Sequence, residues 1–273
     1  MANLPSKYEL YEAAVQSPEQ HVHLFSSIYS DLFGRPARHL REDFCGTFAL
    51  SCAWVKDHPL NAALGIDKDP EPLAYGHKVH LPTLTANQRK RVRTLKRDVT
   101  QPTRERADLV TACNFSIFEL RTYDALVKYL RSVHRSLKSE GLLLLEIAGG
   151  PGLINPGQEK KTLNLPSNSK TKRKFKFSYI WDQQSFDPIT GEASFAIHFT
   201  PLAPKGRRIT GAFNYHWRLW SIPELRAALN DAGFSKSFVY WETHHHSQGT
   251  GEFARSEKGD NVYSWIAYVA GVR

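Results

Sequence analysis

The chain has 273 residues, 41% of them apolar, enough to bury the core of one large domain or of one domain with a sizeable insertion. No apolar run is long enough for a membrane-spanning helix, and the N-terminal residues lack the apolar region of a signal peptide. We therefore expect a cytosolic protein and exclude membrane insertion and secretion.

The net charge of +9 is local. Two clusters without acidic residues carry more positive charge than the whole excess: Arg89, Lys90, Arg91, Arg93, Lys96 and Arg97, and then Lys160, Lys161, Lys170, Lys172, Arg173, Lys174 and Lys176. A solvated helix or loop face explains such clusters, and a polyanion site is the alternative. Because no aromatic-interleaved recognition motif accompanies them, the sequence favours the solvated face.

Three cysteines, Cys45, Cys52 and Cys113, lack the paired spacing of a disulfide framework or a structural zinc site. We predict that they are small, reduced core residues. Cys45 and Cys113 lie near the ends of predicted strands, so both are also candidates to line a pocket.

Two helices are predicted before the first strand, over residues 7–16 and 18–33. The stretch from His39 to Thr47 then indicates a strand end, a tight turn at Gly46 and the start of an apolar helix. In an open parallel sheet, ligands bind beyond the carboxyl ends of the strands. A first turn with an acid beside a glycine suits a nucleoside ligand.

Residues 61–67 predict a second strand that ends in an acid. Asp67 follows Gly46 by about 20 residues, the separation at which a carboxylate can bind both ribose hydroxyls of a nucleoside. Alternatively, Asp67 caps the helix that begins near Pro70. The combined spacing favours the ribose role.

Strands and helices continue to alternate through the first half of the chain: strands over 91–95, 107–113 and 142–147, and a helix over 123–137. Asp98 follows the third strand, where a carboxylate could read an adenine amino group. The alternation predicts a parallel doubly wound sheet.

The pattern changes after Gly150. Residues 151–176 are polar, basic and loop-like, and three antiparallel strands are predicted over 175–186, 192–200 and 209–219. A capped helix begins at Ser221. A final strand pair, over 238–242 and 263–271, is predicted to be joined by a long loop.

This succession resembles the class I methyltransferases that use S-adenosylmethionine, over nearly the whole chain. Against their usual strand, acid and Gly-x-Gly-x-Gly turn, Glu42 stands at the acid position and Gly46 at the central glycine, while Phe44 and Phe48 replace the outer glycines. More narrowly, the chain is similar to a largely uncharacterised group that carries Leu40-Arg41-Glu42-Asp43-Phe44-Cys45-Gly46-Thr47 as its turn.

The resemblance implies an α/β fold with a doubly wound, seven-stranded Rossmann-like sheet whose last strand is antiparallel. It implies N-terminal helices over 1–36, a methyltransferase core over 37–150 and 221–273, and a β-rich insertion over 151–220 that acts as a lid or substrate region. We expect the two phenylalanines in the turn to adopt ordinary φ values, since they carry a Cβ atom.

The resemblance also implies S-adenosylmethionine as cofactor and S-adenosylhomocysteine as product. The expected cofactor-binding residues are Tyr11, Arg41, Glu42, Phe44, Cys45, Gly46, Thr47, Asp67, Lys68, Asp98, Val99, Asn114 and Phe115. For two of them a structural role is open: Tyr11 can pack the N-terminal helices, and Arg41 can form a salt bridge with Glu42 or Asp43 instead of binding the cofactor carboxylate.

The expected reaction is in-line methyl transfer to the nitrogen or oxygen of a small-molecule acceptor, which needs alignment more than a catalytic base. Candidate substrate residues are Ser116, Phe118, Trp181, Tyr215 and Arg218, with His216 a possible proton acceptor. Packing is favoured for Trp217 and Trp220. The alternatives are an RNA methyltransferase that uses the basic clusters at 89–97 and 160–176, and a cofactor-binding protein without catalysis.

Three consecutive histidines, residues 244–246, cannot all converge on one metal ion in an ordinary strand. We expect them at the start of a solvated loop and predict no metal. Arg255 or one of these histidines could still reach a substrate from that loop.

Overall fold

Contacts divide the chain into two units in the computed structural model, which describes residues 5–165, 175–202, 208–245 and 248–273. The smaller unit holds the chain up to Ser17 and Pro151–Leu219, and the larger holds Pro18–Gly150 and Trp220–Arg273. Within the described ranges, no helix has the length and apolar character that crossing a membrane requires.

The larger unit contains the elements that were expected to alternate. They are α2 (Pro18–Phe33), β1 (His39–Asp43), α3 (Ala49–Asp57), β2 (Ala62–Asp67), α4 (Pro70–Val79), η1 (Leu81–Thr83), α5 (Ala86–Arg89), β3 (Val92–Lys96), β4 (Ala107–Ala112), η2 (Ser116–Glu119), α6 (Tyr123–Ser136), β5 (Leu137–Gly149), α8 (Ile222–Asp231), β10 (Lys236–His245), β11 (Gln248–Arg255) and β12 (Trp265–Val272). Side-chain caps explain several helix starts, such as Asp69 before α4 and Ser221 before α8.

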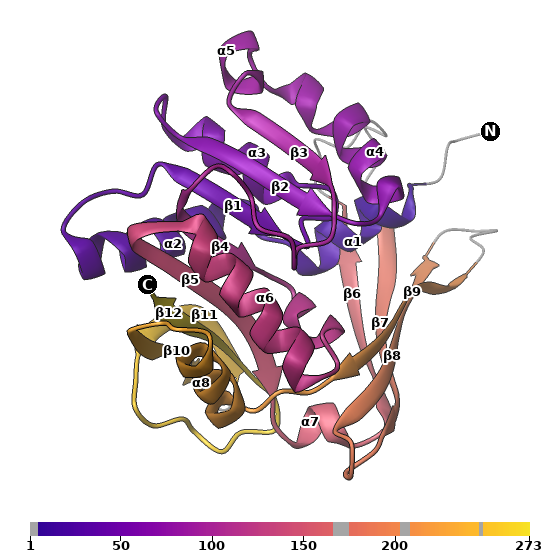
Figure 1. The fold of residues 1–273 in the computed structure, drawn as a ribbon. Helices are drawn as coiled ribbons and strands as arrows, with labels where there is room; N and C mark the ends of the chain where they lie inside the picture. The colour runs from indigo at the N-terminus through magenta and orange to yellow at the C-terminus, as the bar shows by residue number, and fades with distance from the viewer. Residues whose placement is uncertain (1–4, 166–174, 203–207, 246–247) are drawn as a thin grey trace. The chain divides into compact units, whose positions relative to one another are not determined.

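These strands form one eight-stranded sheet in the order β11-β10-β12-β5-β4-β1-β2-β3 (Figure 1). The run from β5 to β3 is parallel, and β12 pairs antiparallel with both β5 and β10. The predicted parallel sheet is confirmed. The strand count differs from the expected seven, because β11 adds an antiparallel strand beyond β10.

The prediction of a long loop between the last two strands is wrong for Gln248–Arg255. This segment lacks an apolar alternation, but its glycines fit the edge of β10. A Cβ at Gly249 would lie 2.4 Å from the Glu242 carboxyl, and Gly251 donates its N–H to Glu242 Oε1 at 2.9 Å. His244 and His245 therefore belong to β10 rather than to a loop start, and His246 lies outside the described residues.

Helices cover the two faces of the sheet (Figure 1). Alternation along β1 sends Arg41 and Asp43 toward α6, where they bond Ser136 and Tyr129, and sends Glu42 toward Ser51 on α3. The crossover between β3 and β4, residues 97–106, contains no helix or strand. As a result, the α6 face of β1, β2 and β3 has no crossover helix of its own.

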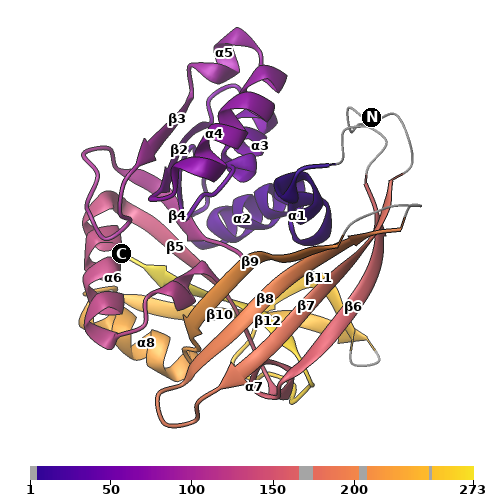
Figure 2. The same cartoon turned by 90° about the vertical axis from the view of Figure 1, so that its right-hand side faces the viewer.

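The smaller unit consists of α1 (Lys7–Val15), α7 (Pro151–Ile154), β6 (Gly157–Asn164), β7 (Lys176–Phe186), β8 (Glu192–Pro201) and β9 (Ile209–Arg218). Its four strands form an antiparallel sheet in the order β6-β7-β8-β9, visible side by side in Figure 2. The expected strands over 175–219 are confirmed. The expectation that residues 151–176 are loop-like is wrong for 157–164, because an edge strand that is solvated on both faces needs no apolar residues.

The first helix belongs to the smaller unit, so the two N-terminal helices do not form one segment over 1–36. Leu10 is buried in a core with Phe177 and Phe199, and Tyr11 packs on Phe213 with ring centroids 4.7 Å apart. The packing role that was open for Tyr11 is therefore filled by the four-stranded sheet rather than by α2.

A buried carboxylate, Asp108 at the start of β4, fixes the amino ends of the parallel strands. Its side chain is 1% exposed, and it accepts hydrogen bonds from the backbone N–H groups of Arg38 and His39 at 3.1 and 2.9 Å. Lys138 Nζ and Arg35 Nη1 bind it at 2.9 and 3.2 Å. These partners hold the pKa of Asp108 well below its usual range despite burial.

We expect Asp108→Ala to destabilise the protein by about 3 kcal/mol, because it leaves two backbone N–H groups and the half-buried Lys138 ammonium group without their acceptor. Urea unfolding at pH 7 measures the change. The matched control is Asp57→Ala at the exposed end of α3, which should shift stability by less than about 0.5 kcal/mol. Equal effects of the two substitutions would contradict the role given to Asp108.

Candidate functional site

The carboxyl ends of β1, β2 and β4 lie next to one another and carry most of the predicted cofactor residues. Asp43 is in register with Ile66 on one side and Ala112 on the other. The residues that follow these positions, Cys45–Thr47, Asp67 and Asn114, therefore meet at one edge of the sheet. Ligands bind at this edge of open α/β sheets.

The turn after β1 uses left-handed backbone at three alternate residues. Phe44, Gly46 and Phe48 have φ of 54, 51 and 48°. The expectation of ordinary φ values for the two phenylalanines is therefore wrong: they adopt the conformation that glycine adopts readily, at a cost of roughly 1–2 kcal/mol each. Phe48 N–H donates to Cys45 O at 2.7 Å and closes the turn.

Packing of the two rings compensates for this backbone strain. Phe48 is completely buried and lies edge-on to His77, with ring centroids 5.1 Å apart, and Phe44 packs on Tyr129. Gly76 makes room for the turn on α4, since a Cβ there would lie 2.2 Å from Thr47 O and 2.4 Å from the Phe48 ring. The phenylalanines thus anchor the turn to both neighbouring helices.

Glu42 provides the cap that α3 lacks. Phe48 stands at the N-cap position and has no capping side chain, whereas Glu42 Oε2 accepts from Ser51 N at 2.9 Å and from Ser51 Oγ at 2.5 Å. Burial, with a smaller contribution from the charges of Asp67 and Asp43, raises the pKa of Glu42 to about 7 despite the opposing effect of the bonds from Ser51. This carboxylate holds the helix start in position and is half protonated near neutral pH.

Asp67 links the tip of β2 to the turn after β1. Its Oδ2 accepts from Gly46 N at 2.7 Å and its Oδ1 from Asp69 N at 2.9 Å. The cap of α4 is Asp69, so the alternative that Asp67 caps this helix is wrong. Burial raises the pKa of the Asp67 carboxyl, which is partly exposed and keeps lone pairs free for a ligand.

Arg41 forms the buried salt bridge that was the structural alternative to its cofactor role. The side chain is 1% exposed, and Nε binds Asp43 Oδ1 at 2.7 Å. Its terminal nitrogens donate to Ser136 Oγ at 2.9 Å and Val99 O at 3.1 Å. The Arg41 guanidinium is therefore held by protein acceptors, and we leave it out of the cofactor site.

Two exposed charges, Lys68 and Asp98, lie close enough to interact beside the tip of β2. Asp98 accepts from Thr100 N at 2.8 Å, which together with Lys68 lowers the pKa of Asp98. Val99 is buried, with its carbonyl bonded to Arg41. These residues follow β3 as the sequence predicted.

The turn after β4 repeats the left-handed geometry of the turn after β1. Asn114 and Phe115 have φ of 53 and 60°. Glu146 on β5 holds this turn by accepting from Asn114 N at 2.6 Å. Among the described residues the Asn114 amide has no bonding partner, so it is available to a ligand. Glu146 and Ser51 were not predicted as site residues from the sequence. Glu146 could have been found because it is a single acid within an otherwise apolar strand.

The two cysteines expected near the pocket are buried and unpaired. Burial raises the pKa of both the Cys45 and Cys113 thiols, so they are neutral and unreactive at pH 7. Of the candidate substrate residues in this unit, Ser116 bonds Cys113 O at 2.7 Å, and Phe118 is completely buried. Phe118 therefore belongs to the core and presents no surface to a substrate.

The remaining candidates belong to the smaller unit. Trp181 stacks on Phe195 with centroids 4.9 Å apart, and Tyr215 lies 4.5 Å from Trp217. Trp217 is 2% exposed and packs on Phe195 and Tyr215, which confirms the hairpin packing predicted for it. The same prediction is wrong for Trp220, which is buried in the larger unit, where it packs on Tyr123 and donates to Leu120 O. Two further residues lie on β9: His216 bonds Ser194 and Glu192, and Arg218 Nη1 bonds Leu219 O at 2.7 Å.

The basic clusters differ in their surroundings. Arg91 donates to the carbonyls of Val55, His58 and Asn61 at the end of α3, so it stabilises a helix terminus. Lys160 and Lys161 are exposed on β6, whereas Lys170, Lys172, Arg173 and Lys174 lie outside the described residues. Arg255 lies over the Phe238 ring at 3.7 Å. The described part of the chain holds no group of three or more His, Cys, Asp or Glu side chains arranged for a metal.

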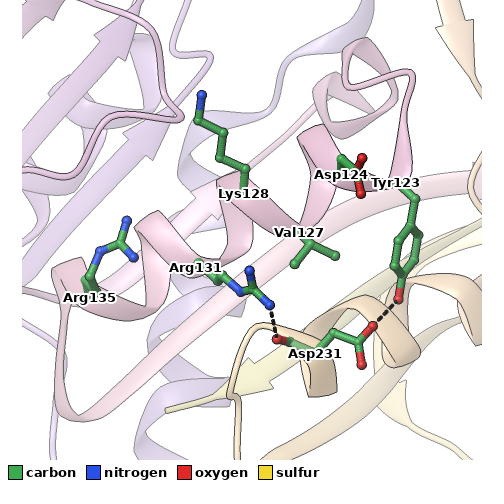
Figure 3. A pocket seen from close by; sticks show the side chains of 7 residues that line it. All are labelled: Tyr123, Asp124, Val127, Lys128, Arg131, Arg135 and Asp231. Carbon is green, nitrogen blue, oxygen red and sulfur yellow. Dashed lines mark hydrogen bonds between the residues drawn. The ribbon is translucent and has the colours of Figure 1, made fainter.

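A groove of about 530 Å³ lies between α6 and α8 (Figure 3). Tyr123 Oη donates to Asp231 Oδ2 at 2.9 Å, and Arg131 donates to the Asp231 carbonyl at 3.2 Å. These bonds join α8 to α6. None of the predicted site residues lines the groove. We therefore describe it as part of the interface between α6 and α8 and not as part of the candidate site.

Comparison with solved structures identifies the fold. The structure of CalS10 with bound S-adenosylmethionine, an amino pentose methyltransferase from Micromonospora echinaspora, matches over 100% of both chains with a TM-score of 0.70 at 16% identity. Streptomyces venezuelae DesVI matches with a TM-score of 0.69 at 15% identity, covering 97% of this chain and 96% of its own. A Clostridium acetobutylicum S-adenosylmethionine-dependent methyltransferase gives 0.64 at 16% identity, covering 96% and 94%.

The fold is therefore the α/β fold of S-adenosylmethionine-dependent methyltransferases, with a mostly parallel central sheet. No family model and no curated protein matches the sequence.

We expect Glu42→Gln to remove a pH-dependent loss of stability. The folded state holds the Glu42 proton up to about pH 7, whereas the unfolded state releases it near 4.5. The wild-type protein therefore loses up to about 3 kcal/mol from this group as the pH rises through that window. In urea unfolding, the free energy of unfolding of the variant relative to that of the wild type should be higher at pH 8 than at pH 5.

The matched control for this titration is Glu19→Gln, an exposed acid at the start of α2. Its stability should follow that of the wild type at both pH values. Parallel pH profiles for Glu42→Gln and the wild type would show that Glu42 does not titrate in this window.

We expect Gly76→Ala to destabilise the protein by about 2 kcal/mol, although alanine normally improves a helix. The added Cβ would overlap Thr47 O and push α4 away from the turn. Gly46→Ala is the control within the turn, since its Cβ meets no atom within 4 Å and costs only the backbone strain of about 1 kcal/mol. Thermal unfolding should rank the variants in this order, and a Gly76→Ala protein as stable as the wild type would disprove the contact.

Proposed function

We propose that this protein is a methyltransferase that transfers the methyl group of S-adenosylmethionine to a small-molecule acceptor. The observation that carries the proposal is the edge formed by β4, β1 and β2, where two adjacent left-handed turns follow β4 and β1 and the partly exposed Asp67 carboxylate follows at the tip of β2. The fold shared with S-adenosylmethionine-dependent methyltransferases supports it. The bound cofactor would supply an electrophilic methyl group on a sulfonium centre.

The chemistry of the donor set fits such a cofactor. Glu42, Asp43 and Asp67 lie close enough for their charges to raise the pKa of Glu42, and only Asp43 has a buried cationic partner. A cationic ligand near these carboxylates would be attracted rather than repelled. Solved structures of the glycopeptide N-methyltransferase MtfA contain S-adenosylmethionine or S-adenosylhomocysteine on the same fold, with TM-scores of 0.53 and 0.57.

In this proposal the residues of the edge bind and orient the cofactor. Asp67 accepts the ribose hydroxyls through its free lone pairs, with Lys68, Asp98 and Val99 flanking the adenine. The turn that Glu42 supports, Phe44–Thr47, contacts the methionine portion, and Asn114 and Phe115 lie along the cofactor. We propose that the unit formed by α1 and β6–β9 acts as a lid that contributes Tyr11, Trp181, Tyr215 and Arg218.

We propose an amine nitrogen as the methyl acceptor. Structures that share the fold include the sugar N-methyltransferase KedS8 and the glycopeptide N-methyltransferase MtfA. An amine needs only to be neutral and in line with the methyl group, so orientation and exclusion of water are the main contributions of the protein.

Titration calorimetry with S-adenosylmethionine tests the cofactor site. The wild type should bind one equivalent, and Asp67→Ala should weaken binding by roughly 100-fold, because two charge-assisted hydrogen bonds are lost. Asp69→Ala is the control beside it. Asp69 caps α4 through Glu71 N at 2.9 Å, so its loss should cost about 1 kcal/mol of stability and leave cofactor affinity nearly unchanged.

Absence of binding to the wild type would refute the proposal. If S-adenosylmethionine binds, labelled methyl transfer to a panel of amino sugars and to a mixed-sequence RNA separates the remaining possibilities. Labelling of RNA that falls steeply with salt would favour an RNA methyltransferase. Binding without transfer to any compound of a metabolite extract would leave a non-catalytic cofactor-binding protein.

A further inference from the structure

A cavity of about 220 Å³ lies over β1, β2 and β3 on the face where the crossover from β3 to β4 has no helix. Its lining includes Arg41, Ala62, Leu64 and Ala107 from the strands. It also brings three residues of the 89–97 basic cluster, Lys90, Arg91 and Arg93, together with Thr103, Glu105 and Arg106 of the 97–106 crossover.

The charges around this cavity are unbalanced. Arg41 is neutralised by Asp43, and Arg93 pairs with Glu105. Lys90 and Arg106 have no carboxylate partner in the part of the chain that the structure describes. Arg91 is bonded to backbone carbonyls rather than to an acid. Two exposed cationic side chains, Lys90 and Arg106, thus line one small space without a carboxylate partner in the described residues.

The floor of the cavity is apolar. Ala62 and Leu64 project from β2 toward the same face as Arg41, because Arg41 and Leu64 are in parallel register. Leu64 and Ala107 are buried at the base. The volume corresponds to about seven water molecules at roughly 30 Å³ each, which is room for one ring with a small substituent.

We propose that this cavity binds a small organic anion: a single aromatic or aliphatic ring that bears a phosphate or carboxylate group. The ring would cover Ala62 and Leu64, and the anionic group would be bound by Lys90 and Arg106 through charge-assisted hydrogen bonds. The site lies on the face of β1–β3 rather than at the carboxyl ends of the strands. It does not depend on the proposed methyl transfer.

The shape of the site favours a small anion over a nucleic acid. A nucleic-acid footprint needs phosphate contacts spread along an exposed surface. Here buried or partly buried apolar side chains line the cavity beside Lys90 and Arg106, and a phosphate backbone alone would leave these apolar side chains uncovered. An anion with an apolar body uses both features.

Titration calorimetry with phenyl phosphate tests the proposal. The wild type should bind one equivalent in roughly the millimolar range or tighter. Benzyl alcohol, which has the ring without the charge, and inorganic phosphate, which has the charge without the ring, should each bind at least tenfold more weakly. Comparable binding of inorganic phosphate would overturn the apolar part of the proposal, and no binding of phenyl phosphate would overturn it entirely.

Two variants locate the site. Lys90→Glu with Arg106→Glu reverses two exposed, unpaired charges and should weaken phenyl phosphate binding by tenfold or more. Ala62→Phe fills the cavity without changing charge and should abolish binding. The matched control, Lys56→Glu with Lys78→Glu, reverses two exposed charges on α3 and α4, across the sheet, and should bind as the wild type does.

Loss of binding in the control pair, or unchanged binding in Ala62→Phe, would show that phenyl phosphate binds elsewhere. A short mixed-sequence RNA provides the test for a polyanion site. Such a site would be identified if the RNA binds the wild type, does not bind the Lys90→Glu, Arg106→Glu double variant and is not displaced by phenyl phosphate. S-adenosylmethionine titration of Ala62→Phe serves as the folding check. Retained cofactor binding with lost phenyl phosphate binding separates this site from the cofactor edge.

Discussion

The two hydrogen bonds from Ser51 to the Glu42 carboxylate are the constraint on which the candidate site depends. Helix α3 begins at a phenylalanine in left-handed conformation, which offers no capping side chain. Glu42 supplies the acceptor from the adjacent strand and fixes where the helix starts relative to β1. Since Gly46 N is in turn held by Asp67, two carboxylates determine the path of the whole turn.

Placing these carboxyl groups in the turn has an electrostatic cost, because several acids lie close together with little solvent around them. Glu42, Asp43 and Asp67 are removed from water within one small region, and burial raises the pKa of each. Arg41 compensates for Asp43 alone. These carboxyl groups therefore carry more negative charge than Arg41 balances, and a cationic ligand beside them would offset it. Sites that bind ligands commonly retain such electrostatic strain, whereas a purely structural turn would have no reason to.

The sequence predicts the parallel half of the larger sheet well, because buried strands with acidic ends are distinctive. It does not predict β6 or β11, since solvated edge strands carry no apolar alternation. It also fails at Phe44 and Phe48, where average preferences argue against positive φ. Tertiary contacts decide there: Gly76 and Tyr129 provide packing that no local pattern records. Arg41 was predicted to bind the cofactor for the same reason: its partners on α6 and after β3 are distant in the sequence, so no local pattern shows that they bond its guanidinium.

Arg41 also connects the two sites of the larger unit. Arg41 is among the residues that line the cavity over β1–β3, and its guanidinium bonds Asp43 and the carbonyl of Val99. Asp43 in turn accepts from Tyr129, on which Phe44 packs. Direct contacts from Arg41 through Asp43 and Tyr129 to Phe44 thus join the lining of the cavity to the strained turn after β1.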